Sequence, residues 1–123
     1  MPVSFEILPE RALSVVTFAG LFTVEQTEAV LAEFRAQGGQ KYPCIFEFDR
    51  PIANFQPDNI KRICSEMMPP DGGRPTAFVG GNELSYELCD AIVHLIRQPG
   101  RVRAFRSRPE AEAWLKERLA GRI

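Results

Sequence analysis

The chain has 123 residues, of which 45% are hydrophobic and 25% charged, and its formal net charge is −1. These values are typical of one globular domain over residues 1–123, and they exclude a disordered chain. No segment approaches the roughly 20 apolar residues needed to cross a bilayer. The first residues do not resemble a secretory signal either, so we expect a cytoplasmic protein without a membrane span.

The charges are unevenly distributed along the chain. Residues 1–96 hold seven basic and 13 acidic side chains, whereas residues 97–123 hold eight basic and three acidic ones. A basic surface can bind nucleic acid, but no aromatic interleaving suggests stacked bases. We therefore expect a solvated basic edge that complements the acidic remainder of the protein, and no nucleic-acid partner.

Two strands open the chain. Apolar and polar residues alternate from Val3 to Leu8, and a second apolar run extends from Ala12 to Ala19. The intervening Pro9–Arg11 breaks the pattern and Gly20 ends the second run, which predicts a hairpin whose first strand lies at the sheet edge.

A helix follows over Val24 to Gln37. Thr23 and Gln26 have the spacing of a capping box, and Gly38-Gly39 can terminate the helix. Its apolar stripe is Val24, Thr27, Leu31 and Phe34.

The stretch Cys44–Phe48 is the predicted central strand. Pro43 precedes it, and Asp49-Arg50-Pro51 is expected to close it. A helix then begins at Pro57 or Asp58, with Ile60, Ile63, Cys64 and Met67 at helical spacing. The proline- and glycine-rich residues 69–75 predict an exposed loop.

Two further strand–helix units complete the chain. Strands are predicted over Thr76–Gly80 and Arg101–Arg106, and a helix over Glu83–Gln98 with Asn82 as its cap. The expected buried face of that helix is Leu84, Leu88, Ala91, Ile92, Leu95 and Ile96. The last helix starts after a capping box of Ser107 and Glu110, and its apolar face is Ala111, Trp114, Leu115 and Leu119.

The predicted order is β-β-α-β-α-β-α-β-α, an α/β fold with a five-stranded, mainly parallel sheet and an antiparallel first strand. If neighbouring strands pair in chain order, right-handed crossovers place the helices mainly on one face. The other face should then be partly polar. The residues expected there are Glu6, Ser14, Glu47, Thr76 and Arg103.

The sequence indicates a location for function more clearly than a chemistry. Ligands of open α/β folds usually bind at the carboxyl ends of the strands. The polar residues after the central strand therefore form the predicted interaction surface: Asp49, Arg50, Asn54 and Asp58.

No residue set predicts a catalytic or metal site. Glu47 and Asp49 are too few for a metal site, and we expect their side chains to differ in orientation. His94, the one histidine, shares a helix face with Tyr86 and Asp90 and is interpreted as a surface hydrogen-bonding group. The three cysteines, Cys44, Cys64 and Cys89, lie in apolar segments and are expected to be buried and reduced. We expect neither a cofactor nor a metal.

Together with the element order, the runs Val102-Arg103-Ala104-Phe105 and Glu110-Ala111-Glu112-Ala113-Trp114-Leu115 resemble the SpoIIAA-like proteins. These are a branch of the STAS (anti-sigma-factor antagonist) fold, which is also grouped with lipid-binding domains. The resemblance covers nearly the whole chain and implies a βα superhelix with sequential strands. It also implies a non-enzymatic regulatory or protein-interaction domain.

In phosphorylated STAS proteins, a serine preceded by aspartate opens the helix after the central strand. Pro57-Asp58 occupies the corresponding position here, and no serine or threonine lies between Asp49 and Ser65. Phosphoserine switching is therefore not implied, and Asp58 is either a fixed negative charge or a helix cap. The expected partner is another protein or a second copy, as in a homodimer. The alternative is a carrier of a small apolar, lipid-like ligand, with a pocket lined by Phe55, Met67 and Met68.

Overall fold

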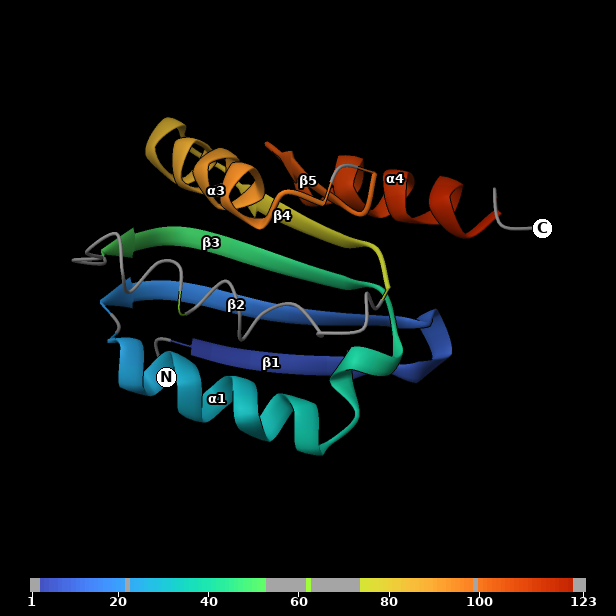
Figure 1. The fold of residues 1–123 in the computed structure, drawn as a ribbon, viewed down its shortest axis with the longest axis horizontal. Helices are drawn as coiled ribbons and strands as arrows, with labels where there is room; N and C mark the ends of the chain where they lie inside the picture. Colours follow the sequence, from blue (N-terminus) through green and yellow to red (C-terminus); the bar gives the residue numbers. More distant parts are fainter. Residues whose placement is uncertain (1–2, 22, 53–61, 63–73, 99, 121–123) are drawn as a thin grey trace.

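Five strands form one sheet in which each strand lies beside the strand before it in the chain (Figure 1). The computed structural model describes residues 3–21, 23–52, 62, 74–98 and 100–120. The first strand pairs antiparallel with the second, and the remaining pairs are parallel, which confirms the predicted sheet. The strands are β1 (Val3–Leu8), β2 (Leu13–Leu21), β3 (Cys44–Ile52), β4 (Thr76–Gly80) and β5 (Val102–Phe105).

The described part of the chain contains the α-helices α1 (Val24–Ala36), α3 (Glu83–Ile96) and α4 (Arg108–Ala120). None of them is both long and apolar enough to cross a membrane. Of the helix predicted between β3 and β4, Arg62 alone is described, and it is helical. Its guanidinium donates to the Glu28 carboxylate of α1 at 2.9 Å from Nε and 2.5 Å from Nη2.

The start and the buried face of α1 agree with the prediction. The Thr23 hydroxyl accepts a hydrogen bond from the Gln26 amide at 3.1 Å, and the Gln26 side chain accepts one from the Thr23 amide at 2.9 Å. This capping box satisfies two amides that an uncapped helix leaves without partners. The buried residues of α1 are those of the predicted stripe: Val24, Thr27, Leu31 and Phe34.

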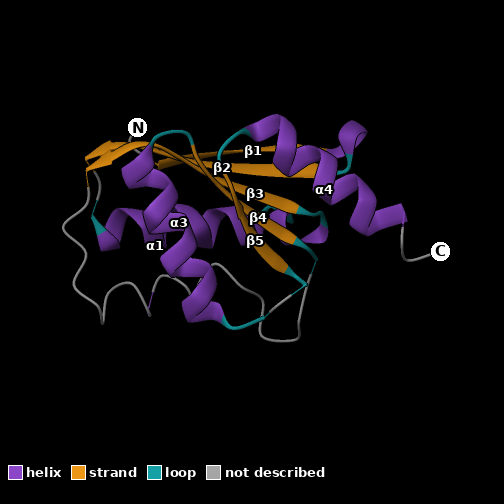
Figure 2. Ribbon diagram, turned by 90° about the horizontal axis from the view of Figure 1, so that it is seen from above, coloured by secondary structure: helices purple, strands orange, loops and turns teal. Residues whose placement is uncertain are grey.

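Helices lie on both faces of the sheet (Figure 2), and each face carries a separate apolar core. The crossover helices α1 and α3 share one face, as right-handed connections between neighbouring strands require. α4 follows the last strand and packs on the other face, over β4 and β5. The strand residues beneath α1 and α3 include Val16, Phe18, Phe46, Phe48 and Phe78. Those on the α4 side are Leu13, Val15, Ile45, Ala77, Val79 and Phe105.

The face opposite α1 and α3 is partly polar, as predicted, but not with all of the expected residues. Those that lie on it are Glu6, Glu47 and Arg103. For Ser14 and Thr76 the prediction is wrong, because both are buried on the face that α1 and α3 cover. Their hydroxyls donate to backbone carbonyls, Ser14 to Gly39 at 2.9 Å and Thr76 to Arg74 at 3.2 Å. A hydrogen-bonded hydroxyl can be buried at little cost.

The buried face of α3 differs from the predicted one. Ser85, Cys89 and Ile92 are buried, whereas Leu84 is 80% exposed. The reason lies at the end of β4, where a Cβ on Gly80 would lie 2.4 Å from the carbonyl carbon of Ser85. Ser85 therefore lies directly against the sheet, and the rest of the buried face follows it at helical spacing. Of the other predicted residues, Leu88 and Ile96 are half-buried, and Ala91 and Leu95 are exposed.

Cys44 and Cys89 are buried, free thiols, as predicted, and Cys64 lies outside the described residues. Burial raises the pKa of Cys44 well above its ordinary value. Burial also raises the pKa of Cys89 to about 12, with a smaller contribution from the neighbouring Asp90 carboxylate. The unfolded chain therefore ionises these thiols at lower pH than the folded protein does. Their contribution to stability is complete below the ordinary thiol pKa and is lost as the pH rises above it.

We expect the free energy of unfolding to fall by up to about 2.7 kcal/mol per pH unit above about pH 9, roughly 1.4 kcal/mol for each buried thiol. Urea unfolding between about pH 8 and pH 10 measures this slope. The Cys89→Ala variant should show about half the slope, which separates the thiols from other groups that titrate there. An equal slope in both proteins would contradict the assignment.

Candidate functional site

β2 and β3 both extend past their predicted ends. The sequence predicts that β2 ends at Gly20 and that β3 closes at Asp49, yet both strands continue and remain paired. The pairing skips one residue, because Ala19 lies opposite Asp49 whereas Gly20 lies opposite Pro51. Arg50 is thus the extra residue of a β-bulge. A bulge tolerates the missing amide hydrogen of Pro51, and Gly20 adopts a φ of 71° at this point.

The bulge lies within the predicted interaction surface. Asp49 is exposed in the carboxyl-terminal half of β3, and Arg50 follows it as the extra residue. The structure therefore places these two charged residues at one edge of the sheet. The predicted site residues outside the described part of the chain are Asn54 and Asp58 of the interaction surface, and Phe55, Met67 and Met68 of the apolar pocket.

Asp49 shares its sheet face with polar residues that the sequence analysis did not include in the site. The expectation that Glu47 and Asp49 differ in orientation is wrong, because residues two apart in a strand point to the same face. Thr17 of β2 pairs with Glu47, and Ser4 of β1 pairs with Thr17, so the same face continues across three strands. We refer to Ser4, Glu6, Thr17, Glu47 and Asp49 as the open sheet face. Their two-residue alternation along each strand was the signal that could have identified them.

A chain of ion pairs connects the open sheet face to α4. The Arg108 guanidinium lies 3.8 Å from the Glu47 carboxylate and 3.7 Å from that of Glu112. Glu112 also binds Arg11, which precedes β2. These side chains are between 26% and 51% exposed, so each pair contributes little to stability. Their role is geometric, because they link the first turns of α4 to β3 and to the β1–β2 connection.

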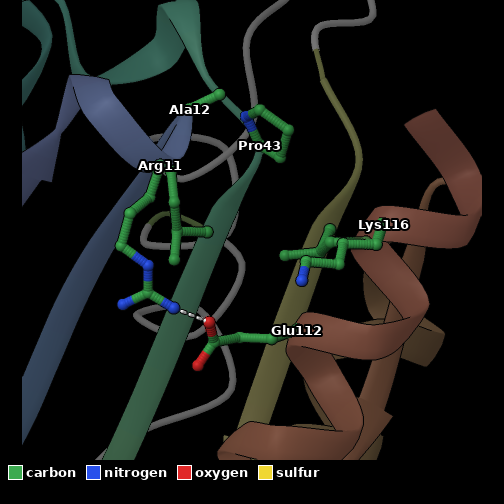
Figure 3. A pocket seen from close by; sticks show the side chains of 7 residues that line it. Arg11, Ala12, Pro43, Glu112 and Lys116 are labelled. Carbon is green, nitrogen blue, oxygen red and sulfur yellow. Dashed lines mark hydrogen bonds and ion pairs between the residues drawn. The ribbon is translucent and has the colours of Figure 1, made fainter. Parts of the chain in front are cut away.

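A hollow of about 230 Å³ lies beside this ion-pair chain, between the β1–β2 connection and α4 (Figure 3). The Arg11 guanidinium and the Glu112 carboxylate meet across it, and Lys116 extends along its wall. It lies at the amino ends of β2 and β3, the opposite end of the sheet from Asp49. Because Arg11 and Glu112 neutralise each other, the lining of the hollow keeps the positive charge of Lys116. Its other lining residues are Ala12, Leu13, Pro43 and Leu115.

The described residues offer no catalytic grouping at the carboxyl edge of the sheet. Among them, no set of three or more His, Cys, Asp and Glu side chains could hold a metal ion. His94 is exposed, and its Nδ1 lies 2.7 Å from the Asp90 carbonyl oxygen, which confirms its interpretation as a surface hydrogen-bonding group. The Tyr86 ring lies under the Arg106 guanidinium, 4.0 Å from the ring centroid. The arrangement is suited to binding through charge.

No protein-family model and no curated protein matches the sequence significantly. Among solved structures, the chain is similar to an uncharacterized protein from the DUF3478 family with a SpoIIAA-like fold, from Shewanella loihica PV-4. The two share 17% sequence identity, and the match covers 92% of this chain and 91% of that chain with a TM-score of 0.57. At this identity the likeness defines the fold. The protein has a SpoIIAA-like fold, as its element order and C-terminal runs predict.

Proposed function

We propose that this protein is a non-enzymatic STAS-like domain that binds a protein partner at the carboxyl edge of β3. The proposed recognition surface consists of Asp49, Arg50, Asn54 and Asp58, together with Glu47 of the open sheet face. Because no phosphoacceptor serine or threonine precedes Ser65 after the central strand, recognition here does not depend on phosphorylation at the usual STAS position.

The observation that carries this proposal is the abrupt change of burial along β3. Ile45, Phe46 and Phe48 are at most 2% exposed, and the next residue, Asp49, is exposed. Asp49 lies within β3 directly after the buried Phe48, so its backbone is held by a close-packed strand. Such a charge can orient a partner without rearranging on binding.

The charge of the open sheet face indicates the kind of partner. Glu6, Glu47 and Asp49 are acidic, and Arg108 is the described cation that borders them. Complementary charge steers association and fixes the orientation of a complex more than it adds affinity. The expected partner is therefore a protein with a cationic surface, and its binding should weaken as salt concentration rises.

Charge reversal at Asp49 tests the proposal. Asp49→Lys should lower the affinity for the partner by about tenfold or more, mainly through slower association, while circular dichroism remains unchanged. Glu33→Lys on α1 is the matched control, because it makes the same charge change at an exposed residue on the opposite side of the sheet. Surface plasmon resonance at low and high salt would separate the rate and salt effects.

The proposal fails if Asp49→Lys binds the partner like the wild type. Arg103→Glu provides the contrasting result, because Arg103 is exposed on β5 within the basic C-terminal part of the chain. Loss of binding in Arg103→Glu alone would place recognition on that basic edge.

A further inference from the structure

An apolar row on α3 lies outside both cores. Leu84 is 80% exposed and Leu95 is 42% exposed, and no other large hydrophobic residue in the described part of the chain is comparably exposed. Ala91 is exposed between them, and Leu88 is half-buried at the border of the core. Residues three and four apart are neighbours on a helix surface, so these four side chains form one continuous row. We call Leu84, Leu88, Ala91 and Leu95 the α3 row.

The α3 row is more than the usual scatter of apolar surface residues. Single exposed leucines are common and need no explanation, whereas a contiguous apolar strip marks a contact surface. The side of α3 that holds Ser85, Cys89 and Ile92 already supplies its contact with the sheet. The α3 row is therefore not needed to attach the helix to the described part of its own domain.

The spacing of the α3 row reads the same in both directions. Its residues are separated by four, three and four positions. An antiparallel second copy of α3 would therefore place Leu84 opposite Leu95 and Leu88 opposite Ala91. Each leucine at an end meets a leucine, and at the centre the small Ala91 leaves room for Leu88. This alternation of large and small residues allows close helix packing.

The charges at the two ends of α3 also favour an antiparallel pair. Its first half carries Glu83 and Glu87, Asp90 and His94 lie in its second half, and Arg97 is the C-terminal cap. In an antiparallel pair Glu83 at the start of one helix lies beside the Arg97 cap of the other, whereas a parallel pair would place like charges side by side at both ends. The two ends of α3 are therefore complementary in charge, as a two-fold symmetric interface requires.

We propose that the α3 row is a homodimer interface in which two α3 helices pack antiparallel. One pair of four-turn helices buries less than the roughly 800 Å² per partner of a standard stable interface, so the dimer is weak and concentration-dependent. The interface leaves the open sheet face free, because α3 and Asp49 lie on opposite faces of the sheet. The proposal therefore does not depend on the proposed function, and each can fail without the other.

A charge placed at the centre of the row tests the interface. Ala91→Glu puts a carboxylate at an exposed position that tolerates glutamate in a helix, but the dimer would bury each new charge against Leu88 of the second copy. Sedimentation equilibrium should show the wild type dimerising and Ala91→Glu dimerising at least about tenfold more weakly. Ala32→Glu on α1 makes the same change at another exposed helical alanine and should dimerise like the wild type.

Two outcomes would overturn the interface. One is a wild type that remains monomeric up to about millimolar concentration, which is the result expected if the rest of the chain covers the row. The other is a dimer that Ala91→Glu and Ala32→Glu leave equally strong, which would place the contact elsewhere.

A charge exchange tests the antiparallel orientation separately. His94→Glu should weaken the dimer several-fold, because in this register the new carboxylate lies between Glu83 and Glu87 of the second copy. Adding Glu87→Lys to that variant restores opposite charges across the antiparallel pair and should recover most of the lost affinity. If the double variant dimerises no better than His94→Glu alone, the helices do not pair in this way. Circular dichroism of each variant checks that α3 is intact.

Discussion

Replacing Gly80 with alanine should destabilise the folded protein by roughly 3 kcal/mol. A Cβ at this position would lie 2.4 Å from both the carbonyl carbon of Ser85 and the amide nitrogen of Tyr86, and 2.6 Å from the Ser85 carbonyl oxygen. All three atoms belong to the backbone of α3, so no side chain can turn aside to make room. The helix must move away from β4, and the contact of Ser85, Cys89 and Ile92 with the core loosens with it.

The adjacent Gly81 provides a matched control. A Cβ there would meet nothing within 4 Å, and the residue is exposed. Gly81→Ala should therefore change the free energy of unfolding by no more than about 0.5 kcal/mol. Urea unfolding of both variants measures the difference. Similar stabilities for Gly80→Ala and Gly81→Ala would mean that the first turn of α3 does not pack closely on β4.

The close approach of the α3 backbone to Gly80 explains why the sequence predicted the existence of α3 but not its orientation. The most apolar side of the helix includes Leu84 and Leu95, and apolarity alone favours burying it. The structure instead buries the side that contains Ser85, because the glycine at the end of β4 allows the helix backbone to touch the strand. That contact depends on the absence of a side chain on another element. A hydrophobic pattern within one helix cannot reveal it.

Most of the sheet could be predicted, because its signals are local. The alternation from Val3 to Leu8 and the apolar run Cys44–Phe48 each identify a strand, and the capping residues Thr23 and Gln26 identify the start of α1. The predicted strand ends near Gly20 and Asp49 were wrong because the true ends depend on contacts between strands. Arg50 is accommodated as a bulge by the pairing of two strands, and pairing is not visible in either strand alone.

The candidate site was also predictable only where its signals are local. Asp49 was identified because it follows an apolar strand in the sequence, and the structure finds it exposed. The ion pairs that border it were not identified, because Glu47 and Arg108 are 61 residues apart and meet only when α4 folds back over the sheet. The position of α4 also determines which part of the sheet remains open. Local patterns locate the edge of a strand, and tertiary packing decides what surrounds it.

The two surfaces proposed here have different physical characters, which fits separate roles. The open sheet face is polar and acidic, so it suits an encounter governed by charge. The α3 row is apolar with charges of both signs beside it, so it suits a contact with an identical surface. Because the sheet separates them, a dimer would present two open sheet faces at once. A partner with two cationic sites would then bind the dimer more tightly than the monomer.

Replacing Phe46 with alanine should destabilise the protein by about 3–5 kcal/mol. Phe46 is 1% exposed at the centre of the core beneath α1 and α3. Its ring stacks on Phe78 with centroids 5.3 Å apart and lies 6.4 Å from the ring of Phe18, so the variant loses contacts on both neighbouring strands.

The loss at Phe46 should come from the cavity left behind and from the missing aromatic contacts, since close-packed neighbours relax only in part. Phe46→Leu fills much of the same space and should therefore lower the free energy of unfolding clearly less than Phe46→Ala does. A domain of this size has only about 5–15 kcal/mol of stability, so the alanine variant should unfold at much lower urea concentration with a similar dependence on urea. A loss below about 1 kcal/mol for Phe46→Ala would mean that the aromatic core can close around the missing ring, contrary to the close packing of Phe18, Phe46 and Phe78.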